Sequence, residues 1–353
     1  MRNALRIDNE KLNYLVGKIA NTCRVAKDMV LPFVDFTDLM EHLFRSLDKT
    51  DGGPLLVGGH VSPAVAIAAD RAHLEVKEIL GISPFTGAPD TLLREITTGS
   101  EIVYAANPNR VTGANYGLAE LEMLAEALPG GTLILDEHYF DFYGITGLSL
   151  LERYDNIVIV RSLTASFGLG GDESGFAIAS SRRIETLKEN YNWTKITGTN
   201  YKIITTCLTS RDAVDMRLRL LHDESLRVAQ ALNRLKVQNR ITAADFMLLR
   251  VADPARVGNF LCRSKIEVEN LDGYPELKNY IRYEIQSELT NDLFISTFGK
   301  MPSEFYRMDS LDRRMIRLRK AGHKTEKTED TVPDDSVFDR GSIDIKDRIT
   351  EKV

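Results

Sequence analysis

Short apolar runs alternate with helical patterns through the middle of the chain. Six of these runs are flanked by turn-forming or polar residues and are therefore predicted to be strands. They are Pro54–Gly58, Leu74–Leu80, Ile102–Ala105, Thr132–Asp136, Asn156–Arg161 and Ser174–Ala179. Between them, apolar residues recur at helical spacing over Ser62–Ala72 and Gly117–Leu128. This alternation predicts an α/β domain with a mostly parallel sheet and crossover helices.

A longer amphipathic segment, Tyr201–Leu235, follows the predicted sheet. It exceeds the usual length of a helix in a globular protein, so we expect it to link two domains. A smaller α+β unit is predicted after it. Its elements are the strands Ala244–Val251, Ile266–Glu269 and Tyr280–Ile285 and the helices Pro254–Arg263 and Thr290–Phe298.

The pattern divides the 353-residue chain into four segments. We expect an N-terminal helical segment over residues 1–50 and a large α/β domain over 51–205. Residues 206–305 are predicted to hold the linker helix and the small C-terminal α+β domain, and 306–353 a polar tail. From about Ala321 onward, apolar residues are too few to offset the entropy of ordering the chain, so we expect a flexible tail.

Composition excludes several classes of partner. The chain has 45 Lys and Arg against 51 Asp and Glu, a net charge of −6, so we expect no nucleic-acid partner. Cys23, Cys207 and Cys262 are widely spaced, which argues against a disulfide framework or a metal site. This cysteine pattern favours a reduced, cytoplasmic setting. The polar N-terminus and the lack of an 18-residue apolar run indicate no membrane association.

Three motifs occur in order along the predicted sheet. They are NPNRVTG (Asn107–Gly113), LILDEHYFDF (Leu133–Phe142) and IVIVRSLTASFGLGG (Ile157–Gly171). Together they resemble the fold-type I aminotransferases that use pyridoxal phosphate (PLP), particularly the branch of histidinol-phosphate aminotransferase and threonine-phosphate decarboxylase. The resemblance extends roughly over residues 53–298. It implies the aspartate aminotransferase fold of PLP-dependent transferases, with an active site at a subunit interface.

Several positions that contact PLP in the family carry different residues here. Ala165 occupies the place of the lysine that forms the Schiff base, and Glu173 that of the arginine that holds the cofactor phosphate. Arg110 replaces the asparagine that contacts the phenolic oxygen of the cofactor. Ser62 would take the place of a stacking aromatic ring, and the segment 34–37 lacks the glycine of the phosphate-binding turn. PLP is the cofactor that the family implies, but conventional binding is not expected, so the cofactor is unknown.

Other positions carry the residues that the family has at its active site. Asp136 matches the aspartate that pairs with the pyridinium nitrogen, and Tyr139 matches the tyrosine near the phenolic oxygen. Ser162 and Thr164 keep hydroxyl groups where relatives bind phosphate. Arg282 matches the arginine that holds the substrate carboxylate, for which a guanidinium offers a bidentate fork. Polar groups for a ligand pocket are therefore expected to survive.

Structural roles are open alternatives for most of these residues. Asp136 could cap a turn, although open α/β sheets bind ligands at the carboxyl ends of their strands. Tyr139 and Arg282 could anchor loops and domain contacts. Asn107, a further candidate ligand contact, could serve the turn of its motif. His138 is another polar group at the expected pocket, but a lone histidine is more often structural than catalytic.

Arg110 and Glu173 are harder to explain structurally, because each places a charge where relatives contact the cofactor. They could pair with each other across the cavity. Alternatively, they could bind a ligand with a cationic group near Glu173 and an anionic group near Arg110. An engineered change of lysine to Ala165 alone would have left these other contacts intact, so natural divergence is the preferred explanation.

Three functions follow, in order of preference. The first is a diverged aminotransferase-like protein that binds a small molecule, such as an amino acid or an amine, or catalyses PLP-independent chemistry with Asp136, His138, Tyr139 and Arg282. The second is a non-catalytic dimer partner of an active aminotransferase paralogue. The third is a PLP-dependent enzyme of the histidinol-phosphate aminotransferase type. We expect a homodimer, or a heterodimer with such a paralogue.

Overall fold

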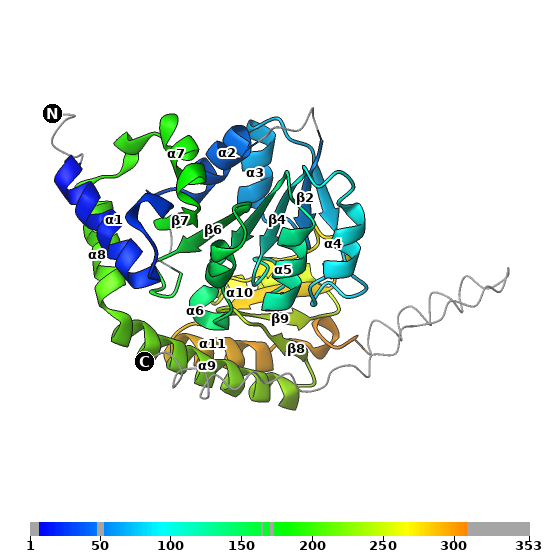
Figure 1. Ribbon diagram of the computed structural model, residues 1–353. Coiled ribbons are helices and arrows are strands. Elements are labelled where there is room, and N and C mark those ends of the chain that lie inside the picture. Colours follow the sequence, from blue (N-terminus) through cyan, green and yellow to red (C-terminus); the bar gives the residue numbers. More distant parts are fainter. Residues whose placement is uncertain (1–6, 48–52, 164, 170–172, 309–353) are drawn as a thin grey trace, which may run out of the picture.

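The computed structural model describes residues 7–47, 53–163, 165–169 and 173–308. Within these ranges the chain forms a large α/β domain and a smaller α+β domain, joined by a long helix (Figure 1). The predicted fold class is therefore confirmed. Most of the predicted tail, from residue 309, lies outside the described residues.

A seven-stranded sheet forms the centre of the large domain. Its strand order is β1-β7-β6-β5-β4-β2-β3. Strands β2 to β6 run parallel, whereas β7 is antiparallel to β6 and β1 is antiparallel to β7. The strands are β1 (Val30–Phe33), β2 (Leu55–Gly58), β3 (Val76–Ile79), β4 (Ile102–Ala106), β5 (Thr132–Asp136), β6 (Ile157–Ser162) and β7 (Gly175–Ala179).

Strand β1 was not predicted, and it corrects the expectation that the first 50 residues are a helical segment. Its four residues are too few to show a pattern, and they include Pro32. The strand forms because Val30–Phe33 pairs with β7 at one edge of the sheet. A proline is tolerated at such an edge because no second neighbour needs its missing N–H.

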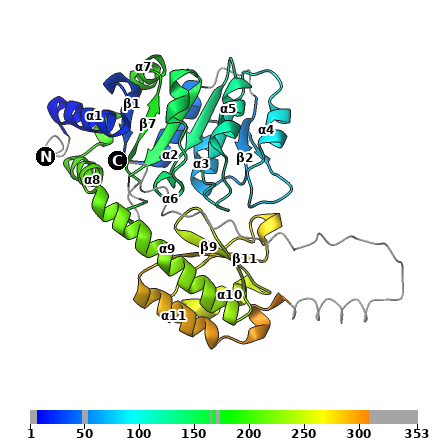
Figure 2. The same cartoon turned by 60° about the horizontal axis from the view of Figure 1, so that its bottom comes forward.

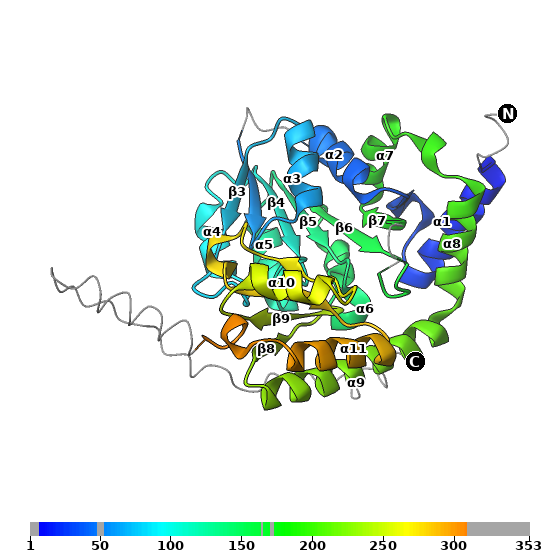
Figure 3. The same cartoon turned by 180° about the vertical axis from the view of Figure 1, so that it is seen from behind.

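Helices cover both faces of the large sheet (Figures 1 and 3). Successive strand residues alternate between the two layers; Val103 and Ala105 of β4 face one, and Ile102 and Tyr104 the other. Both faces are buried, so the strands are apolar throughout. The first layer contains α1 (Asn9–Cys23), α4 (Pro89–Glu95), α5 (Leu118–Glu126) and α8 (Gly198–Thr209), and the second α2 (Phe36–Leu47), α3 (Pro63–Arg71) and α7 (Ser181–Glu189).

The predicted linker helix Tyr201–Leu235 is two helices. α8 ends at Thr209, and α9 (Arg211–Arg234) begins after Ser210, whose φ of −106° and ψ of 44° break the helical geometry. The apolar periodicity continues across Ser210, so the sequence pattern does not reveal this break. Helix α8 packs on α1, and α9 runs from the large domain to the small one (Figure 2).

The small domain contains a four-stranded antiparallel sheet in the order β10-β11-β9-β8. Helices α9, α10 (Pro254–Cys262) and α11 (Glu288–Gly299) pack against it. The strands are β8 (Gln238–Ile241), β9 (Phe246–Arg250), β10 (Glu269–Asn270) and β11 (Tyr280–Glu284). The remaining short helical elements are α6 (Phe140–Tyr143) and 3₁₀ turns at Lys27–Met29, Leu148–Glu152, Trp193–Lys195, Pro275–Leu277 and Ser303–Phe305.

Two strands of the small domain differ from the prediction. Strand β8 is half exposed and mostly polar, so its sequence shows no strand pattern. It is a strand because it pairs with β9. The predicted strand Ile266–Glu269 is largely wrong, because only Glu269 and Asn270 pair with β11. Burial of Ile266 in the domain core explains the apolar run that suggested a strand.

The two domains meet at a small apolar cluster. Val111 and Tyr139 of the large domain pack with Phe246 and Leu248 of β9. The hydroxyl of Tyr274 also donates a hydrogen bond to the carbonyl of Val61, at 3.0 Å. These contacts bring the small domain against the carboxyl ends of the parallel strands.

Candidate functional site

The carboxyl ends of three neighbouring parallel strands converge, as the sequence predicted. Asn107 directly follows β4, while Asp136 and Ser162 are the last residues of β5 and β6. The backbone N–H of Asn107 donates to the carbonyl of Asp136, at 2.9 Å. This edge of the sheet is where open α/β folds bind ligands.

Asp136 forms a buried ion pair with Arg110. Arg110 Nε lies 2.5 Å from Asp136 Oδ2, and Arg110 Nη2 lies 3.2 Å from Oδ1. The Tyr104 hydroxyl also donates to Oδ2 at 2.5 Å, and the backbone N–H of His138 donates to Oδ1 at 3.1 Å. Asp136 is fully buried. Its two carboxylate oxygens therefore already have four donors within the protein.

The Arg110 guanidinium also stacks on an aromatic ring. Its central carbon lies 3.7 Å from the ring centroid of Phe36, the first residue of α2. Burial by itself lowers the pKa of Arg110, but Asp136 outweighs this effect and raises the pKa above its usual value. The suggested pair between Arg110 and Glu173 is wrong, because Arg110 binds Asp136.

Two further candidate residues shape the loops at the sheet edge. Asn107 Nδ2 donates to the Tyr116 carbonyl at 3.2 Å, and Asn107 Oδ1 accepts from the Tyr116 N–H at 2.8 Å. The Ser162 hydroxyl accepts from the N–H of Ala165 at 3.3 Å. The remaining candidate of the third motif, Thr164, lies outside the described residues.

Arg282, on β11, contacts the large domain. Its Nη2 donates to the Tyr139 hydroxyl at 3.0 Å and its Nη1 to the Arg110 carbonyl at 3.3 Å, while its guanidinium stacks on Phe246 at 4.0 Å. Nη1 also lies 3.3 Å from Glu269 Oε2. Arg282 lines a groove of about 450 Å³ on the small domain. In this structure its guanidinium connects the domains.

His138 lies beside Tyr139, with ring centroids 4.6 Å apart. Burial lowers the pKa of His138 well below its usual value, and the positive charges of Arg110 and Arg282 lower it further. The imidazole is therefore neutral near pH 7. It adds no positive charge to its surroundings.

A cleft of about 760 Å³ lies between the two domains. Four predicted site residues line it: His138, Tyr139, Ala165 and Glu173. The other described candidates do not line this cleft; they are Asn107, Arg110, Asp136, Ser162 and Arg282. Its volume is in the range of small-molecule sites, about 300–1,000 Å³.

Most of the charged residues of this cleft were missed by sequence reasoning. They come from α9, from the residue before β9, from the end of β11 and from the start of α11. They are Arg217, Asp223, Glu224, Asp245, Glu284 and Glu288. No short motif connects these segments, so no sequence signal could have grouped them.

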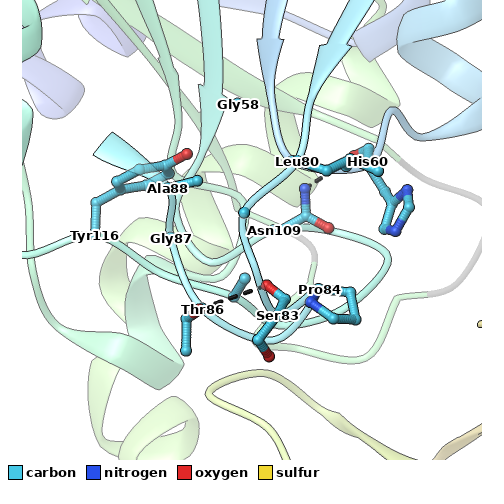
Figure 4. Close-up of a pocket in the computed structure, with 13 residues that line it drawn as sticks. Gly58, His60, Leu80, Ser83, Pro84, Thr86, Gly87, Ala88, Asn109 and Tyr116 are labelled. Carbon is cyan, nitrogen blue, oxygen red and sulfur yellow. Dashed lines mark hydrogen bonds between the residues drawn. The ribbon is translucent and has the colours of Figure 1, made fainter. Parts of the chain in front are cut away.

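A second cavity lies near the ends of β2 and β3 (Figure 4). The side chain of Asn109 is part of its lining and donates to the His60 carbonyl at 2.9 Å. Its volume of about 10 Å³ has room for about one water molecule. The cleft between the domains is the candidate site, because four predicted site residues, His138, Tyr139, Ala165 and Glu173, line it.

The loop after β5, which carries His138 and Tyr139 into the cleft, is held by a second buried ion pair. Arg161 Nε donates to Glu137 Oε2 at 2.7 Å, and the N–H of Gly147 donates to Glu137 Oε1 at 2.7 Å. The two charged side chains are 10% and 1% exposed. The guanidinium of Arg161 also stacks on Phe140, at 3.7 Å.

We expect Glu137→Gln to lower the free energy of unfolding by about 3–5 kcal/mol, because it leaves the Arg161 guanidinium buried without a counter-charge. Urea denaturation would measure the change. The matched control is Glu122→Gln, which removes the partner of Arg153, whose side chain is 57% exposed. The control should leave the transition nearly unchanged. Equal effects of the two substitutions would contradict a special role for the buried pair.

Within the described ranges, no group of His, Cys, Asp and Glu side chains could hold a metal ion. No helix in the same ranges combines the length and apolar character that crossing a membrane requires.

Comparison with known proteins shows the same relatives in sequence and in structure. Residues 10–287 match the sequence model of the family described as Aminotransferase class I and II. The histidinol-phosphate aminotransferase of Francisella philomiragia is 25% identical over 61% of this chain and 60% of its own length. Histidinol-phosphate aminotransferase 3 of Mesorhizobium japonicum is 27% identical over 80% of this chain and 76% of its own. The chain spans 55–60% of the length of the first curated relatives it matches.

Two solved structures have the same fold. The histidinol-phosphate aminotransferase of Sinorhizobium meliloti, in complex with pyridoxal-5'-phosphate, superposes with a TM-score of 0.73 and 16% identity, covering 82% of this chain and 81% of that one. The L-threonine-O-3-phosphate decarboxylase of Porphyromonas gingivalis superposes with a TM-score of 0.68 and 18% identity, covering 81% and 87%. Identities this low show the fold alone. The match of the family sequence model over residues 10–287 decides the family: this chain belongs to the class I and II aminotransferases.

Proposed function

We propose that this protein does not carry out conventional PLP-dependent transamination and that it binds a small molecule in the cleft between its domains. The observation that carries the proposal is the buried pair of Asp136 with Arg110. Asp136 is the residue that matches the family's partner of the pyridinium nitrogen. Here a guanidinium from the same chain is already its partner.

A pyridinium nitrogen would have to displace Arg110 to reach Asp136. Displacement would break the Nε and Nη2 contacts and the stacking on Phe36. It would also leave the Arg110 guanidinium, 12% exposed, without its carboxylate. Separating such a buried pair is costly, because the remaining charge keeps its desolvation penalty. The residues around Asp136 therefore do not fit the cofactor.

The other two cofactor contacts are also unfavourable. Ala165 lines the cleft but has no amine with which to form a Schiff base. Glu173, also in the lining, places a carboxylate where a cofactor phosphate of about −1.5 to −2 charges would need a cation. At an effective dielectric constant of about 20, each unit-charge pair about 4 Å apart contributes about 4 kcal/mol. Since about 1.4 kcal/mol is tenfold in affinity, this reversal of sign would severely weaken phosphate binding.

Association with another subunit is a second candidate function, favoured by apolar side chains at the cleft. Leu169 and Leu220 line it and are 41% and 60% exposed, and Met216, also on α9, is 60% exposed. A partner surface covering these side chains would remove them from water. Native mass spectrometry of the freshly purified protein would report a second subunit, an active paralogue or a retained metabolite.

Mixing the purified protein with PLP should produce no borohydride-fixed adduct within the cleft, because Ala165 supplies no amine and no lysine is among the described residues that line it. Mass spectrometry of the reduced protein would make the measurement, with a histidinol-phosphate aminotransferase treated in parallel as the positive control. A borohydride-fixed adduct on a lysine of the cleft region would refute the proposal and favour a PLP enzyme with a relocated amine.

A further inference from the structure

The cleft between the domains has a strongly acidic lining. Among its described residues are six carboxylates and one guanidinium. The carboxylates belong to Glu173, Asp223, Glu224, Asp245, Glu284 and Glu288, and the guanidinium belongs to Arg217. His138 contributes no charge near pH 7, because its pKa is well below the usual value. The cleft therefore carries a large excess of negative charge for a protein with a net charge of only −6.

Two of the six carboxylates have ion-pair partners within the protein. Arg227 Nη2 lies 2.8 Å from Glu224 Oε2, and Arg282 Nη2 lies 3.6 Å from Glu284 Oε1. Among the described residues, no ion-pair partner within 4 Å is found for Glu173, Asp223 or Glu288. The single guanidinium of the lining, Arg217, donates through Nε to the Ser166 carbonyl at 3.0 Å. The uncompensated carboxylates favour a cationic ligand.

Asp245 is a second, independent indication of a ligand. Its Oδ1 atom is buried and has no hydrogen-bond partner in the described structure, although the residue lines the cleft. Burial raises the pKa of Asp245 to about 6, and Glu284 contributes to the increase, while Arg282 and Tyr139 oppose it. A buried acceptor without a donor is rare in folded proteins and requires an explanation. A donor supplied by a ligand would satisfy Oδ1.

The arrangement of the carboxylates fits an extended cation better than a metal ion. Within the described residues, no three acidic, His or Cys side chains are close enough together to hold a metal ion. Apolar side chains share the lining with the acidic groups: Leu169, Leu220, Leu221 and Ile285. An aliphatic amine with several charges would match this mixture, because its methylene groups can pack on leucine and isoleucine while its ammonium groups bind carboxylates.

We propose that this cleft binds an aliphatic diamine or polyamine, an inference that rests on the proposed function because it names the ligand class of the same cleft. An amino-acid ligand fits less well, since its carboxylate would meet the acidic lining. Arg282, the matched carboxylate-binding residue, does not line the cleft and contacts Tyr139. Arg217 is the one described guanidinium in the lining, and it already donates to a carbonyl.

Isothermal titration calorimetry of the full chain with spermidine and with putrescine tests the proposal. Both should bind, spermidine more tightly, with affinity falling as sodium chloride rises because exposed charges are screened. Asp245→Asn should weaken spermidine binding at least about tenfold, the loss expected for one charge-assisted hydrogen bond. Asp223→Asn, at an exposed position on α9 where folding is not at risk, should also weaken it. Asp70→Asn, exposed on α3 away from the cleft, is the matched control and should have no effect.

Amine binding should also release a proton near pH 6. An ammonium group stabilises the ionised form of Asp245 and so lowers the pKa from about 6. The affinity should therefore rise between about pH 5 and 7, where the amine itself stays charged. Calorimetry in buffers of different ionisation enthalpy measures the released proton. Asp245→Asn should abolish this proton release. If Asp245 has only a structural role, the variant should release as many protons on amine binding as the parent protein.

Several outcomes would overturn the proposal. The proposal fails if neither amine binds, or if magnesium chloride alone or an amino acid such as glutamate binds more tightly than spermidine. It would also fail if Asp245→Asn, Asp223→Asn and the parent protein bound spermidine with equal affinity. The borohydride experiment with PLP on the same preparation separates this inference from the proposed function. Amine binding together with a PLP adduct would reject the proposed function and keep the ligand class. If the protein neither binds the amines nor forms a PLP adduct, the ligand class is rejected and the proposed function is kept.

Discussion

Replacing Arg110 with methionine should lower the free energy of unfolding by about 3–5 kcal/mol. The substitution keeps an apolar side chain against Phe36 but removes the partner of Asp136, which is fully buried. Tyr104 and the His138 N–H would remain as donors to the carboxylate. Two hydrogen bonds without a counter-charge do not compensate a buried anion. Urea denaturation monitored by circular dichroism would measure the loss.

A double-mutant cycle would show whether the loss comes from the pair. Asp136→Asn combined with Arg110→Met should be less destabilised than the sum of the two single variants, because neither buried charge remains. Arg153→Met is the matched control, since Arg153 pairs with Glu122 on the surface. Additive effects at Arg110 and Asp136, or equal losses at Arg110 and Arg153, would show that the pair is not coupled and would weaken the argument against cofactor binding.

Restoring the amine alone, by Ala165→Lys, should produce no transamination above the parent protein. The new lysine would face the cleft, but Arg110 would still occupy the carboxylate of Asp136 and Glu173 would still repel a phosphate. A histidinol-phosphate aminotransferase assayed with the same amino donors and acceptors provides the reference rate. The transamination rate of Ala165→Lys should stay several orders of magnitude below the reference rate, a difference within the range of enzymatic rate enhancements.

A second variant makes the Ala165→Lys result interpretable. Adding Arg110→Asn and Glu173→Arg restores the family's residues at all three positions, and only this combination should gain PLP absorbance. Circular dichroism would confirm that both variants are folded. Robust activity of Ala165→Lys by itself would contradict the view that several contacts, and not just the lysine, are lost. A PLP band in the single variant without activity would place the defect in the substrate contacts.

The sheet of the large domain was largely predictable from the sequence. Both of its faces are buried, so strands such as β5 are continuous apolar runs, and Thr132–Asp136 was predicted with the bounds it has in the structure. Strands stabilised mainly by their neighbours were not predictable. Val30–Phe33 and Gln238–Ile241 have no strand pattern and form because β7 and β9 pair with them. The break at Ser210 was hidden for a similar reason, because the apolar period continues through it.

The candidate site was predictable only in part. Motif matching located His138, Tyr139, Ala165 and Glu173, all of which line the cleft. One of the two alternatives left open for Arg110 was a pair with Glu173, whereas Arg110 binds Asp136. The acidic lining escaped motif matching, because residues such as Asp223 and Asp245 come from segments of the small domain that share no motif.

The amino-acid sequence by itself determined the buried strands of the large sheet that follow β1, the family motifs and the lack of an amine at position 165. These properties depend on local periodicity and on residue identity at single positions. Tertiary structure decided that Asp136 and Arg110, 26 residues apart, neutralise each other, and that six carboxylates from distant segments share one cleft. Coulomb energy depends on distance in space and on the surrounding dielectric, and neither follows from separation along the chain.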